Sequence, residues 1–155
     1  MRAIHFTSLN IDEDGACLAD ALLLGGGGGP APNLEELSFE DLEEDTVEQL
    51  ASELFARGAL ANITTFIFSS VDFTKHSMGA LMDGFRQSGH QGRKLKNLRF
   101  VNCSEDDESA TPPAKLSFPL IEGLRDGLFP TLEELYTPCR GLLVGIVAEM
   151  LEMVR

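Results

Sequence analysis

The sequence contains no tryptophan, a single tyrosine and only three cysteines among 155 residues. Cys17, Cys103 and Cys139 are too widely separated and too few to form a disulfide framework, and this pattern is typical of a reducing compartment. Acidic residues follow too soon after the N-terminus to leave room for the apolar core of a secretory signal. No apolar run reaches the roughly 20 residues of a membrane span. We therefore expect a protein of the cytoplasm or, although no positive signal indicates it, of the nucleus, and we expect no contact with a membrane.

Basic residues are also scarce, with 12 lysines and arginines against 25 aspartates and glutamates. The resulting net charge of −13 opposes binding to a phosphate backbone, so nucleic-acid binding is not expected. A protein partner with a basic surface is the natural complement. The length of 155 residues and the hydrophobic content of 43% predict a single domain, residues 1–155, with a continuous core.

The segment 33–54 combines two hydrophobic periods in succession. Its first part alternates apolar and polar residues as a strand does, at Leu34, Leu37 and Phe39. Its second part places apolar residues three and four apart, as in a helix with one buried face, at Val47, Leu50 and Leu54. One strand and one helix cannot bury both apolar faces alone, so the pattern predicts a unit that stacks on copies of itself.

Variants of this unit recur along the chain, with predicted boundaries near 1–32, 33–61, 62–94, 95–130 and 131–155. The first shared apolar position holds Met1, Leu34, Ile63, Leu95 and Leu132. The second holds Ile4, Leu37, Phe66, Leu98 and Leu135. The third holds Phe6, Phe39, Phe68 and Phe100, which we expect to form an aromatic ladder in the interior.

Helices are predicted near 16–23 and 77–85, along an apolar stripe from Leu116 to Leu128, and over 142–154. In the last unit, Thr137 and Pro138 replace strand residues and predict a degenerate copy.

Three segments between these elements have a structural and a functional interpretation. The run Gly25–Gly29 is a flexible connector rather than a phosphate loop, because no Lys-Ser or Lys-Thr follows it. Residues 86–94 form either an exposed loop or a basic docking patch, and residues 104–108 either a solubilising loop or a phosphorylation or docking segment.

The aligned units resemble the leucine-rich repeat, and a helix after each strand is similar to its ribonuclease-inhibitor-like subclass. The resemblance implies an α/β solenoid, a horseshoe arc of about five repeats with a parallel concave sheet and outer helices. The family usually places Asn or Cys at the ninth position, where the side chain bridges the backbones of neighbouring coils. Here only Cys103 conforms, and the other units have Leu9, Leu42 and Val71.

The resemblance also implies that residues between the ladder positions line a concave binding face. The expected central column is His5, Ser38, Ile67, Arg99 and Tyr136. We predict Arg99 and Tyr136 as anchors because these residue types dominate interface energetics. Acidic side chains would steer a basic partner, and the full predicted binding set is Arg99, Tyr136, Glu35, Glu36, Glu40, Asp41, His5 and Lys96.

No catalytic, metal-binding or cofactor site is predicted. His5, His76 and His90 have no metal-ligand spacing to a cysteine, and Cys103 and Cys139 have no predicted neighbouring base.

The sequence therefore favours a non-catalytic scaffold for protein–protein interaction. The alternative is a regulator of a small GTPase, because the resemblance extends to the acidic Ran GTPase-activating proteins. A third hypothesis is that the chain is a fragment of a longer array, or self-associates through its ends, because Met1 already occupies a ladder position and the helix at 142–154 is apolar on nearly every side.

Overall fold

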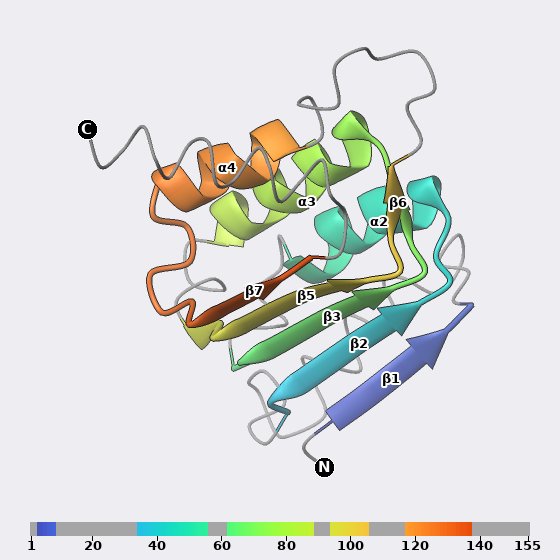
Figure 1. Ribbon diagram of the computed structural model, residues 1–155, viewed down its shortest axis with the longest axis horizontal. Helices are drawn as coiled ribbons and strands as arrows, with labels where there is room; N and C mark the ends of the chain where they lie inside the picture. Colours follow the sequence, from blue (N-terminus) through green and yellow to red (C-terminus); the bar gives the residue numbers. More distant parts are fainter. Residues whose placement is uncertain (1–2, 9–33, 56–61, 89–93, 106–116, 138–155) are drawn as a thin grey trace.

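A computed structural model describes residues 3–8, 34–55, 62–88, 94–105 and 117–137. Their main feature is an open, parallel sheet of five strands in the order β1-β2-β3-β5-β7, so each strand lies beside its predecessor in the sequence (Figure 1). The strands are β1 (Ala3–Thr7), β2 (Glu36–Glu40), β3 (Thr65–Ser69), β5 (Asn97–Val101) and β7 (Glu134–Tyr136). The α/β class and the parallel sheet are therefore confirmed.

The register of the sheet confirms the alignment of apolar positions made from the sequence. Phe6 pairs with Phe39, Phe39 with Phe68, and Phe68 with Phe100. The ring centroids of these neighbours lie 5.5, 6.1 and 5.7 Å apart, and the rings are stacked. The predicted aromatic ladder is thus present in the core, because parallel strands in register place equivalent side chains next to one another.

Three helical segments cover one face of the sheet (Figure 1). They are α2 (Glu44–Leu50), which continues into the π-helical turn η1 (Ala51–Phe55), α3 (Lys75–Ser88) and α4 (Ser117–Arg125). The predicted helical spacing is confirmed in α2 and η1, where Val47, Leu50 and Leu54 are buried. Buried side chains of α3 and α4 complete the core: Met78, Leu81, Met82, Phe85, Leu120 and Ile121.

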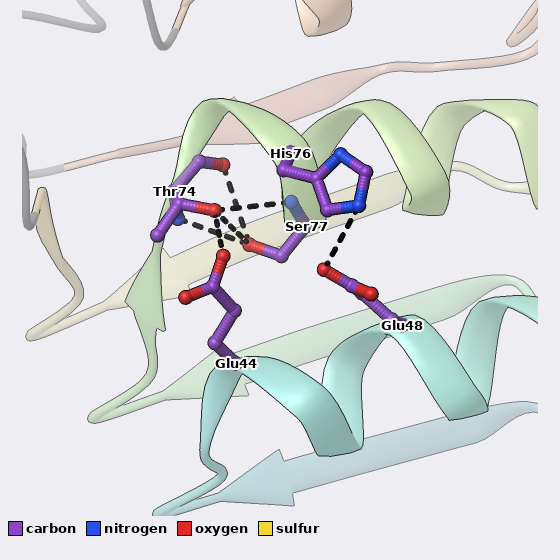
Figure 2. Close-up of polar contacts among 5 residues, drawn as sticks. All are labelled: Glu44, Glu48, Thr74, His76 and Ser77. Atoms are coloured by element: carbon purple, nitrogen blue, oxygen red, sulfur yellow. Dashed lines mark hydrogen bonds and ion pairs between the residues drawn. The ribbon is translucent and has the colours of Figure 1, made fainter.

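The N-terminus of α3 is fixed by a reciprocal pair of side-chain caps (Figure 2). The Ser77 backbone N–H donates to Thr74 Oγ1 at 3.1 Å, and the Thr74 N–H donates to Ser77 Oγ at 3.0 Å. The Thr74 hydroxyl also donates to the Glu44 carboxylate of α2, and His76 Nε2 lies 3.4 Å from Glu48 Oε1. The cap satisfies backbone donors and ties α3 to the first turn of α2.

The predicted helical stripe from Leu116 to Leu128 is wrong at its C-terminal end, because α4 ends at Arg125. Gly127 adopts a left-handed conformation with φ of 70°. The Gly127 N–H donates to the Leu124 carbonyl and the Leu128 N–H to the Gly123 carbonyl, at 3.1 and 2.9 Å. These bonds form a Schellman motif, in which glycine is favoured at the left-handed position.

In the five-stranded sheet, β1, β2, β3 and β5 are each followed by a residue with positive φ at the equivalent position. Ser8, Asp41, Ser70 and Asn102 have φ values between 50° and 57°, although none is glycine. Two of the chain segments then pair again as β4 (Asp72–Phe73) and β6 (Ser104–Glu105). The start of the acidic segment 104–108 is thus a short strand and not a loop, because the turn at Asn102 directs it beside β4.

Cys103 occupies the position predicted for a backbone-bridging side chain. Its thiol donates to the Phe68 carbonyl of the preceding strand, with a sulfur–oxygen distance of 3.5 Å, and the residue is buried. Leu42 and Val71 at the equivalent positions are buried apolar residues, as expected.

The segment 86–94 is not entirely a loop, because α3 extends to Ser88. Arg86 donates to Asp83 at 2.8 Å and to Asp126, which follows α4, at 3.2 Å. Partial burial by itself lowers the pKa of Arg86, but the hydrogen bonds and charges of Asp83 and Asp126 outweigh it and raise the pKa. Arg86 therefore links two helices, and Lys94 donates to Asn62 at 2.7 Å.

Several predictions concern residues outside the described ranges: the helices at 16–23 and 142–154, the run Gly25–Gly29, His90, Cys17 and Cys139. Within the described ranges, no helix has the length and apolarity needed to cross a bilayer.

Candidate protein-interaction face

The sheet surface opposite the helices, which we call the open face, is formed by alternate residues of the strands. Its central column follows the register His5, Ser38, Ile67, Arg99 and Tyr136, as predicted. A second column is Ala3, Glu36, Thr65, Asn97 and Glu134, and a third is Thr7, Glu40, Ser69 and Val101. Successive strand residues point to opposite faces, so burying the ladder on the helix side presents these columns to solvent.

The β5–β7 half of the open face contains cations that are matched by carboxylates. Arg99 Nη2 donates to both carboxylate oxygens of Glu134 at 3.0 Å. Lys96 Nζ donates to Glu133 at 2.8 Å. These ion pairs are exposed, and such pairs contribute roughly 0.2–1 kcal/mol each. They neutralise the charge of this half more than they stabilise the fold.

Tyr136 stands beside Arg99 in the central column, and its side chain is 48% exposed. It is the exposed large hydrophobic residue of the described part of the chain. A large aromatic side chain with a polar hydroxyl, held on a strand, is a typical contact residue at protein interfaces.

The β1–β2 half differs, because the described segments 3–8 and 34–41 contain no lysine or arginine. Their carboxylates belong to Glu35, Glu36, Glu40 and Asp41. His5 Nε2 lies 3.0 Å from Glu40 Oε2, and Asp41 accepts a hydrogen bond from the Ser8 hydroxyl at 3.0 Å. The predicted binding residues thus form two groups with different electrostatics: an acidic one on β1 and β2, and a neutralised one on β5 and β7.

Three features of the face differ from the sequence prediction. Arg99 and Lys96 were expected as groups available to a partner, but both engage neighbouring carboxylates. Glu133 and Glu134 were not selected from the sequence, although aligning the units at Leu95 and Leu132 places Glu133 opposite Lys96 and Glu134 opposite Asn97. Ser38 was expected at the surface but is only 7% exposed, since a small side chain is covered by its larger neighbours in the column.

The helix side offers a shallow surface hollow lined by one helix only, at Lys75, His76, Gly79, Ala80 and Asp83 of α3. Nearby, Thr74 and Glu44 are hydrogen bonded, but the Thr74 oxygen also caps α3. The cluster in Figure 2 therefore stabilises helix packing. Within the described segments, no group of three His, Cys, Asp or Glu residues is arranged to hold a metal ion.

The chain matches no protein-family model, and no curated protein is significantly similar to it. The function must therefore be inferred from the geometry of the open face.

Proposed function

We propose that this protein is a non-catalytic scaffold of leucine-rich repeat type that binds a partner protein on its open face. In this proposal the strands and helices continue as a curved solenoid, and the open face is its concave side. The partner is a protein with a basic surface, attracted by the carboxylates of β1 and β2.

Three features support the repeat architecture. The strands pair in sequential order and in register, and the phenylalanine ladder occupies equivalent positions. A residue with positive φ follows each of β1, β2, β3 and β5. The Cys103 thiol bonds to the backbone of the preceding strand, as a bridging side chain in a repeat coil should.

The observation that carries the binding proposal is the contrast between the repeating apolar residues of the covered face and the varied residues of the open face. Residues that face the helices are repeated phenylalanines and leucines, whereas the open face combines carboxylates, ion pairs and an exposed tyrosine. Tyrosine belongs to the residue types that are enriched at protein interfaces.

Site-specific photo-crosslinking in cells tests the proposal. A benzophenone amino acid replaces Ile67 at the centre of the open face, and the matched control replaces Ala80, which lines the hollow on α3. We expect a discrete protein adduct from position 67 and none from position 80. Absence of any adduct specific to position 67 would contradict binding through the open face.

A further inference from the structure

The chemistry of the open face changes across its strands, from the carboxylates of β2 to the exposed tyrosine of β7. Both ends lie on columns that the register defines. Glu36 and Glu40 flank Ser38 along β2, and Tyr136 ends the central column that contains Ser38. β2 and β7 are three strand intervals apart, which corresponds to about 14 Å at the usual spacing of neighbouring strands.

At the acidic end, a small residue lies between two carboxylates of the same strand. Ser38 is small and 7% exposed, and Glu36 and Glu40 lie two residues to either side of it on the same face. Neither described segment of the β1–β2 half supplies a lysine or arginine to balance these carboxylates. A lysine or arginine of a partner, placed above Ser38, would lie between two carboxylates.

Beyond Ser38, the central column offers apolar contacts rather than carboxylates. Ile67 follows Ser38 and is partly exposed, and Tyr136 is 48% exposed at the far end. Arg99 stands between them, but its charge is balanced by Glu134. An apolar side chain is therefore compatible with this end, whereas a second unpaired cation would meet Arg99 and Lys96.

We propose that the open face binds a segment of a partner protein that lies across the strands, with a lysine or arginine over Ser38 and an apolar side chain on Tyr136. This inference rests on the proposed function and adds the orientation and chemistry of the bound segment. The two contact groups of the partner would be about 14 Å apart, equal to the separation of β2 and β7. The charge complementarity at β2 and the exposed aromatic ring at β7 together define this occupant.

Selection of random twelve-residue peptides displayed on phage tests the footprint. We expect the enriched peptides to carry a lysine or arginine and, separated from it, an aromatic or aliphatic residue. Binding of the synthesised peptides should weaken by about tenfold for Glu36→Gln/Glu40→Gln and for Tyr136→Ala, a change that corresponds to about 1.4 kcal/mol. Raising the salt concentration should weaken binding to the native face and have less effect on the double variant.

The matched control is Glu133→Gln, which removes a carboxylate next to β7 that is already paired with Lys96. Equal losses for Glu133→Gln and for the β2 variant would indicate a general charge effect and overturn the inference. Enriched peptides without a basic residue, or no enrichment at all, would also overturn it. A protein adduct from position 67 that persists in the β2 and Tyr136 variants would reject the footprint while leaving the proposed function intact.

Discussion

The two faces of the sheet differ in what repeats along them. On the covered face, equivalent positions of neighbouring strands hold the same kind of residue, as at Phe39, Phe68 and Phe100, and all three are buried. On the open face, the corresponding column holds histidine, serine, isoleucine, arginine and tyrosine. The comparison teaches that packing constrains the residue type on one face, whereas the other face can vary while the same backbone register is kept.

The largest expected loss of stability comes from a substitution on the covered face. Phe68→Ala removes a ring that is 0% exposed and stacks on both Phe39 and Phe100. We expect a loss of about 3–5 kcal/mol in the free energy of unfolding, because a large cavity is left in a close-packed core. Chemical denaturation measures this loss.

The control for that variant is its neighbour on the open face, Ile67→Ala, for which we expect a markedly smaller loss because the side chain is only partly buried. Similar losses for the two variants would show that the open face is also packed against other parts of the molecule.

A smaller effect is expected in the helix layer that covers the sheet. Gly127 has φ of 70°, and no atom lies within 4 Å of a Cβ added there. Gly127→Ala should therefore destabilise the protein by about 1–2 kcal/mol through backbone conformation alone. Thermal unfolding measures the change. An unchanged midpoint would show that the Schellman turn does not hold α4 against the core.

Loss of the α3 cap should be of similar or slightly smaller size. Thr74→Ala removes the side-chain acceptor of the Ser77 N–H and the hydrogen bond to Glu44. We expect a loss of about 1 kcal/mol, with Lys75→Ala as the matched exposed control. A smaller loss for Thr74→Ala than for the control would contradict a role for the cap in joining α3 to α2.

The smallest stability effect is expected on the open face. A double-mutant cycle of Arg99→Ala and Glu134→Ala should give a coupling free energy of about 0.2–1 kcal/mol, because the pair is exposed to solvent. Denaturation of the four proteins of the cycle supplies the value. A coupling of several kcal/mol would show that this ion pair stabilises the fold substantially. The two faces would then no longer differ in how much they contribute to stability.

Much of the fold could be predicted from residue patterns. The alternation at Leu37 and Phe39 and the three-and-four spacing at Val47, Leu50 and Leu54 gave the correct elements, since burial of one face imposes these periods. The end of α4 was predicted wrongly because Leu124 and Leu128 continue the apolar spacing, while the glycine between them stops the helix. The strand at Ser104–Glu105 was missed because two polar residues carry no periodicity.

The positions of the candidate site residues on the sheet could be predicted from the alignment. Their side-chain contacts could not. Aligning the units placed Arg99 opposite Tyr136 and Glu134 opposite Asn97, yet choosing residues by type alone led to Arg99 as an available anchor. Whether a guanidinium pairs with a neighbouring carboxylate depends on rotamers and distances, which an alignment does not contain. The same limit applies to Ser38, whose burial depends on the size of the side chains around it.

The sequence by itself determined the chemistry of each position: a repeating apolar set that must be buried, and an acidic segment 34–41 that contains no lysine or arginine. The tertiary structure alone decided which of these groups meet, because parallel pairing in register brings residues about thirty positions apart to within hydrogen-bonding distance. Arg99 and Glu134 are neighbours for this reason, and the open face consequently has an acidic half and a neutralised half.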